Sequence, residues 1–93
     1  MFATERLPLA IFLHATRRLG FAGCEVKAGG QKVRFLFEDA RGEAIQAELD
    51  FEQGATVPAN ALFASQKFLR KKMSQAIETR RTGKQYEQEE RRN

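Results

Sequence analysis

The sequence predicts a small α+β domain with an N-terminal helix, a three-stranded antiparallel β-meander and a long basic C-terminal helix packed on the sheet. Apolar residues recur at helical spacing near both ends of the chain, and they alternate with polar residues in the middle. A Gly-Gly pair between two alternating runs suits a hairpin turn. We place the compact domain at residues 1–77, and a projecting helix end with a charged, flexible tail at 78–93.

The first helix is expected to begin after Thr4, a residue type that caps helix N-termini, and to run to about Leu19. Gly20 suits the position that ends it. Its apolar side chains surround much of the helix axis, which predicts a helix covered on more than one side. These side chains are Leu7, Leu9, Ala10, Ile11, Phe12 and Leu13.

The two strands that follow are predicted to form a hairpin with Gly29-Gly30 at its turn, because glycine readily adopts the positive φ angles that such turns need. In this register one face of the hairpin is apolar and the other polar, as expected for a half-buried antiparallel sheet. The predicted pairs are Ala22 with Phe37, Cys24 with Phe35, Glu25 with Arg34 and Val26 with Val33.

Residues 43–51 (EAIQAELDF) are ambiguous in composition, because Ala, Glu and Leu favour a helix. Their apolar members nevertheless alternate with polar residues, which is the pattern of a half-buried strand. A three-residue loop with Gly42 in the left-handed conformation would pair this segment with the strand before it. We therefore expect a third strand at 43–51, with a helix as the alternative.

The long helix is predicted at residues 58–81, beginning at Pro58, which suits a first helical position. An apolar stripe with helical spacing is expected to face the core. It consists of Leu62, Phe63, Gln66, Leu69, Met73, Ala76 and Ile77. Phe68 falls nearly opposite the stripe, among Lys67, Lys71 and Lys72, and Arg70 lies at its border.

The formal net charge of +4 is unevenly placed. Residues 1–63 and 85–93 each carry a net charge of −1, whereas residues 64–84 carry +6. A concentration of positive charge on one helix favours a polyanionic partner such as nucleic acid or an acidic protein surface. The alternative is a solvated helix face that keeps a small domain in solution.

The inventory of catalytic side chains is thin. The single histidine, His14, lies on an apolar helix face, and the single cysteine, Cys24, points inward from its strand. No catalytic residue, no metal ligand set and no cofactor site is therefore predicted, and we expect a protein that is not an enzyme.

The leading hypothesis is an accessory protein that binds RNA or single-stranded DNA through its basic helix. Lysine and arginine side chains on consecutive turns can contact several phosphates, and an exposed Phe68 could stack on an unpaired base. A contact of Phe68 with the first helix or with a partner protein is the alternative for that ring. The predicted nucleic-acid-binding residues are Lys67, Phe68, Arg70, Lys71 and Lys72, flanked by Arg80, Arg81 and Lys84.

The alternative function is a protein-interaction module: a subunit of a ribonucleoprotein or phage assembly, or an inhibitor of a host protein. Its docking patch would consist of Leu9, Phe12, Leu13 and Phe68. Self-association is a milder form of this hypothesis. No apolar run approaches the roughly 20 residues that span a bilayer, so we expect a cytoplasmic protein without a membrane partner.

Three segments together resemble a small family of bacterial and phage-encoded proteins known only as a domain of unknown function. They are ATERLPLAIFL at 3–13, KVRFLFED at 32–39 and FEQGATVPANALFASQKFLRKKM at 51–73. Gln66 departs from the apolar residue expected at its position, and the tail from Glu78 is an addition. The resemblance implies no activity and no site residues, but it implies a phage or mobile-element setting.

Overall fold

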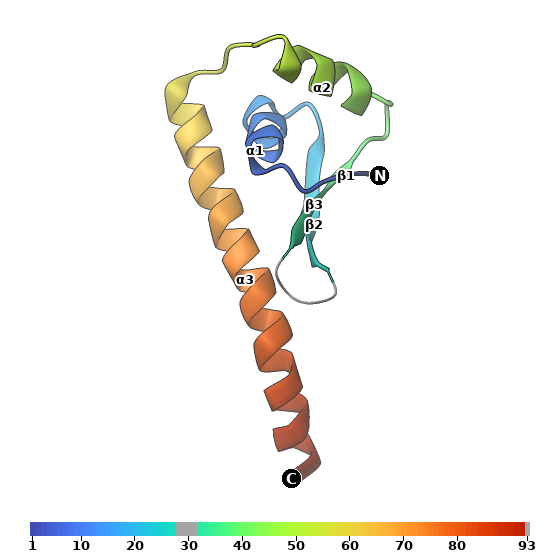
Figure 1. Ribbon diagram of the computed structural model, residues 1–93, viewed down its shortest axis with the longest axis vertical. Coiled ribbons are helices and arrows are strands. Elements are labelled where there is room, and N and C mark those ends of the chain that lie inside the picture. Colours follow the sequence, from blue (N-terminus) through green and yellow to red (C-terminus); the bar gives the residue numbers. More distant parts are fainter. Residues whose placement is uncertain (28–31, 93) are drawn as a thin grey trace.

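In the computed structural model, two helices pack on one face of a three-stranded antiparallel sheet, and a third helix covers the end of the first (Figure 1). The structure describes residues 1–27 and 32–92, and the side chains of the last helix as far as Thr79. The elements in chain order are β1 (Phe2–Thr4), α1 (Leu7–Thr16), β2 (Gly20–Val26), β3 (Val33–Glu38), α2 (Ala44–Glu52) and α3 (Ala59–Arg92).

The α+β class, the antiparallel sheet and the packing of the long C-terminal helix on that sheet are confirmed. The strand order is β1-β3-β2, so the sheet is not the predicted meander. Residues Phe2–Thr4 pair with β3 along the edge predicted for residues 43–51. Thr4 is therefore a buried strand residue rather than a helix cap, and α1 begins three residues later at Leu7.

The prediction of a strand at 43–51 is wrong, because this segment forms α2. The carboxylate of Asp39 accepts hydrogen bonds from the backbone N–H groups of Glu43 and Ala44, at 2.6 and 3.2 Å, which satisfies donors that a helix start leaves free. Ala44 and Ala47 are buried at helical spacing. Helix propensity and this cap therefore outweigh the alternating pattern, since the edge of β3 is already occupied by β1.

The predicted hairpin register holds over three pairs, from Cys24–Phe35 to Val26–Val33. The pairing of Ala22 with Phe37 is wrong, because a β-bulge shifts the register and Phe21 pairs with Phe37 instead. Gly23 has a φ of 143°, which a glycine tolerates at an irregular position of this kind. The turn predicted at Gly29-Gly30 lies outside the described residues.

The first helix ends at Thr16, and Arg17 follows with a left-handed φ of 56°. Its N–H donates to the carbonyl of His14 at 3.2 Å, so Arg17 rather than Gly20 closes the helix. Arg18 then donates from its guanidinium to the carboxylate of Asp50 at 2.5 Å, which ties the end of α1 to α2.

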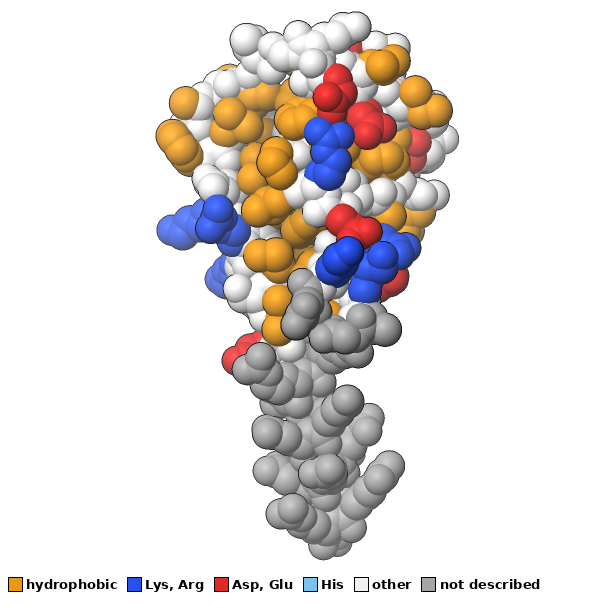
Figure 2. All heavy atoms as spheres, in the orientation of Figure 1, with side chains coloured by type: hydrophobic (Ala, Val, Ile, Leu, Met, Phe, Trp, Pro, Cys, Tyr) orange, Lys and Arg blue, Asp and Glu red, His pale blue; other side chains and the backbone are white. Residues whose placement is uncertain are grey.

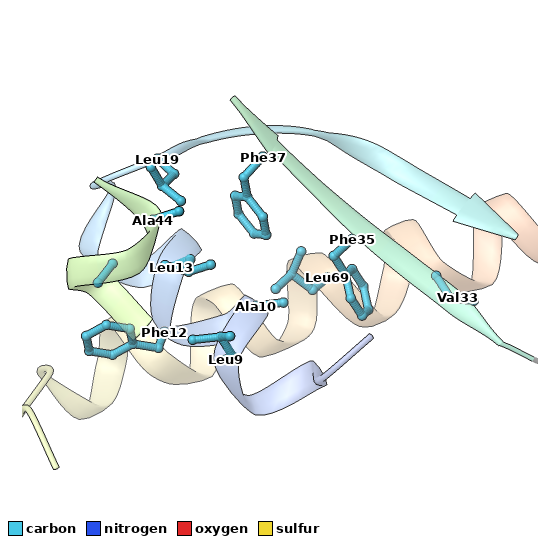
Figure 3. Close-up of a cluster of buried hydrophobic side chains, with 11 residues drawn as sticks. Leu9, Ala10, Phe12, Leu13, Leu19, Val33, Phe35, Phe37, Ala44 and Leu69 are labelled. Atoms are coloured by element: carbon cyan, nitrogen blue, oxygen red, sulfur yellow. The ribbon is translucent and has the colours of Figure 1, made fainter. Parts of the chain in front are cut away.

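The core lies between the sheet and the helices, and its side chains point toward one another in Figure 3. Strand β3 contributes Phe35 and Phe37, which α1 covers with Leu9 and Leu13 and α3 covers with Leu69. All five side chains are at most 1% exposed. Beyond the hairpin, α3 continues to Arg92 and projects past the sheet, whereas the flexibility of the tail stays a prediction (Figure 1).

Candidate nucleic-acid interface

The outer face of α3 carries the candidate phosphate contacts. Lys67, Arg70 and Lys71 are all exposed, and their spacing of three and four residues places them on adjoining turns of one face. Figure 2 shows Lys and Arg side chains gathered on the outer side of this helix. Lys72 is also exposed, but it lies to one side, with its Nζ 5.5 Å from the centre of the Phe68 ring. We call Lys67, Arg70 and Lys71 the basic face.

The charges of the basic face are not neutralised within the described part of the chain. Elsewhere, four basic side chains each lie within 4.0 Å of a carboxylate: Arg6, Arg18, Lys27 and Arg34. The other described cations before α3 are exposed but scattered along the chain: Arg17, Lys32 and Arg41. Among the described side chains, no carboxylate lies that close to Lys67, Arg70 or Lys71. Glu78 is the one acidic side chain described on α3, and it follows Lys71 by seven residues. The face is therefore free to bind an external anion.

Three of the predicted residues belong to the distal part of α3. Arg80, Arg81 and Lys84 continue the same helix, but their side chains lie outside the described part of the structure. Their contribution to the interface stays a prediction.

Phe68 does not lie free among the lysines. Its ring stacks on the imidazole of His14, with ring centroids 4.5 Å apart and planes 16° from parallel. The edge of Phe21 approaches the same ring, at 5.4 Å and 80°. The contact with the first helix, the alternative considered for this ring, accounts for Phe68, so we do not retain it as a base-stacking group.

His14 links α1 to α3 a second time. Its Nδ1 lies 2.7 Å from the hydroxyl oxygen of Ser65, which is only 4% exposed. Burial and, to a lesser extent, the charge of Arg17 lower the pKa of His14 below its ordinary value of 6.5. The imidazole is therefore largely neutral near pH 7 and serves as a packing and hydrogen-bonding group between the helices.

Cys24 is half-buried in β2, next to the core. Burial raises the pKa of its thiol, and the charge of Lys72 offsets this in part. A raised pKa disfavours the nucleophilic thiolate, so the side chain acts as a small apolar group. Among the described residues, no group of three or more His, Cys, Asp or Glu side chains is gathered closely enough to hold a metal ion.

The docking patch predicted for a protein partner is not on the surface. Leu9 and Leu13 are fully buried and Phe12 is 4% exposed, because α2, α3 and the sheet cover α1 on its different sides. The broad apolarity of this helix thus reflects intramolecular packing, and these three residues are withdrawn as a docking site.

An apolar groove that the sequence did not predict opens beside the basic face. It has a volume of about 440 Å³ and lies between α1, the end of α2 and the first two turns of α3. Its walls include Pro8, Ile11, Phe51, Val57, Leu62 and Phe63, and Gln66 is the one polar side chain among its described lining residues. Phe63 was predicted in the core, yet it is 69% exposed at the edge of this groove.

Comparison of the chain with protein-family models, with curated proteins and with solved structures finds no match. The resemblance to a phage-encoded family, and the setting that it implies, therefore stay predictions. In the described part of the chain, no helix combines the length and the apolarity needed to cross a membrane.

Proposed function

We propose that this protein binds nucleic acid, RNA or single-stranded DNA, through the basic face of α3. The observation that supports the proposal is the set of three exposed cations without a carboxylate partner among the described residues. Lysine and arginine side chains in this state attract phosphates and release the counterions that surround them. Lys72, Arg80, Arg81 and Lys84 would extend the contact along the helix. The role would be that of an accessory protein rather than an enzyme.

The proposed preference for unpaired strands loses the support of an exposed aromatic ring on the basic face. Phe68 packs against His14, and Phe63, the aromatic residue one turn before Lys67, lines the apolar groove. Contacts to phosphates alone are largely independent of base sequence. Direct comparison of single strands with duplex therefore decides this part of the proposal.

The test measures fluorescence anisotropy of labelled single-stranded RNA, single-stranded DNA and duplex DNA over a series of salt concentrations. The variant Lys67→Gln/Lys71→Gln removes two charges from the basic face. The control, Lys32→Gln/Arg41→Gln, removes two exposed charges from elsewhere and gives the same net charge. We expect the first variant to bind single strands about tenfold or more weakly, with a log–log salt slope smaller by about 1.4. The control should lose much less.

An equal loss of affinity in both variants would show that the net charge of the protein attracts nucleic acid and that the basic face is not a specific binding surface. Undiminished binding by the Lys67→Gln/Lys71→Gln variant would reject the basic face. Equal or tighter binding of duplex would reject the preference for unpaired strands while leaving phosphate binding in place.

The alternative function, docking to another protein, loses its original patch with the burial of Leu9, Phe12 and Leu13. The apolar groove supplies a different surface for it, since its walls expose aromatic and aliphatic side chains. Exposed apolar surface of this kind is typical of interaction sites.

A further inference from the structure

A second apolar feature lies on the outer side of α2. Ile45 and Leu49 are one turn apart and are 75% and 49% exposed. We call this pair the α2 ridge. Helix α2 carries Glu48, Asp50 and Glu52 and no basic residue, so the ridge projects from an acidic helix. About half or more of each of these side chains stays in contact with water, so much of their apolar surface gains nothing from the fold of a single chain.

Arg6 connects the α2 ridge to the apolar groove. Its guanidinium lies 2.7 Å from the carboxylate of Glu52 and 3.7 Å from that of Glu48, which belong to the same helix as the ridge. The same guanidinium lies 5.4 Å from the centre of the Phe51 ring, which lines the groove. Figure 2 shows apolar side chains on both sides of a cluster of basic and acidic ones on the viewed face. The ridge and the groove thus flank one cluster of charges.

We propose that two copies of this chain associate through this face, with the α2 ridge of each copy in the apolar groove of the other. A two-fold axis near Arg6 would bring both pairs of surfaces together at once, as in the isologous interfaces of most homodimers. The ridge offers aliphatic side chains to a groove whose described lining contains one polar side chain. The charges agree as well. Glu48 and Glu52 share the single cation Arg6, which leaves a net negative charge on α2, and Lys67, one turn after Phe63, would border this charge in the other copy.

A second copy is favoured over a different protein because this chain itself carries both halves of the contact. The proposal does not depend on nucleic-acid binding. Arg70, Lys71 and Lys72 lie outside the lining of the groove, so a dimer would present two sets of these cations, with Lys67 at the border between the dimer contact and the basic face.

The experiment is multi-angle light scattering coupled to gel filtration on the full chain over a range of concentrations. The ridge variant is Ile45→Asp/Leu49→Asp, and the groove variant is Phe63→Asp. All three positions are exposed, so the variants should fold, and circular dichroism checks this. The control, Ala64→Asp, places the same charge at an exposed position beside Phe63 that does not line the groove.

We expect a dimer for the parent and for Ala64→Asp, and dissociation at least about tenfold easier for the ridge and groove variants, because each buries an unpaired charge in the contact. Mixing the two variants should restore part of the association, since the mixed dimer retains one intact ridge in one intact groove whereas a dimer of either variant alone retains none. A parent chain that stays monomeric at the highest concentration would overturn the proposal and leave the groove to another partner. A dimer that survives both variants, or a mixture that associates no more tightly than either variant alone, would overturn it equally.

Discussion

Phe68 and Phe63 exchange the roles that their positions on the helix predict. The Phe68 ring fills the junction of α1, β2 and α3 through its contacts with His14 and Phe21. Phe63 is 69% exposed and touches the groove instead of the core. The difference is a rotation of α3 about its axis, which hydrophobic periodicity constrains only loosely when aromatic residues lie on both sides of the stripe.

This exchange makes a direct prediction about stability. Phe68→Ala should lower the free energy of unfolding by about 2–3 kcal/mol, somewhat less than the loss expected for a fully buried phenylalanine. The matched change Phe63→Ala removes the same atoms from an exposed position and should alter it by less than about 0.5 kcal/mol. Urea unfolding of dilute protein, where association is minimal, measures both. A larger loss for Phe63→Ala than for Phe68→Ala would restore the helix orientation that the sequence predicted.

In α2, hydrogen bonds at the start of the segment favour a helix over the strand that its apolar pattern predicts. Its alternating apolar residues satisfy a strand pattern, but two of them, Ile45 and Leu49, are exposed, and the buried residues Ala44 and Ala47 have helical spacing. The Asp39 carboxylate binds the first free N–H groups of this helix. The loop before it places Gly42 at a φ of 68°, the left-handed conformation expected there from the sequence, although it leads into a helix and not a strand.

Removing this cap should destabilise the protein. Asp39→Ala is expected to lower the free energy of unfolding by about 1 kcal/mol, whereas Asp39→Asn, which keeps a side-chain oxygen, should lose less. Glu38→Ala is the control, because Glu38 is exposed and adjacent but does not cap the helix. Chemical unfolding followed by circular dichroism measures the three variants. Equal effects of Asp39→Ala and Glu38→Ala would contradict the assignment of Asp39 as the cap.

The molecule as a whole segregates its charges. Around α1, α2 and the hairpin, Arg6, Arg18, Lys27 and Arg34 lie beside carboxylates and the remaining cations are scattered, whereas α3 gathers Lys67, Arg70 and Lys71 on one face without a carboxylate partner among the described residues. Like charges at helical spacing repel one another, so the basic face weakens the helix that carries it. An arrangement that costs stability and leaves cations exposed is typical of a surface kept for binding.

We therefore expect stability and nucleic-acid binding to move in opposite directions in Lys71→Glu. The change replaces a repulsive pair with Lys67 by an attractive one and should raise the free energy of unfolding by about 0.5 kcal/mol at low salt. It should also weaken binding of single strands, because a phosphate contact becomes a repulsion. Urea unfolding and anisotropy on the same preparation test both effects. A more stable variant that binds as tightly as the parent would indicate that the charges of the basic face serve only to keep the domain in solution.

Local patterns in the sequence determined the two terminal helices, the register of β2 with β3 over three pairs and the concentration of charge on α3. Each depends on interactions between residues close in the chain, or on a turn that sets the register. Tertiary structure decided that Phe2–Thr4 takes the free edge of β3 and that α3 turns Phe68 inward. By filling that edge, it also left residues 44–52 to their helix propensity and to the cap from Asp39. In these cases the local pattern was compatible with two conformations, and a partner far away in the chain selected one of them. The basic face could be predicted from the sequence because charges stay outside whatever the rotation of the helix. The groove could not, because three separate elements build it.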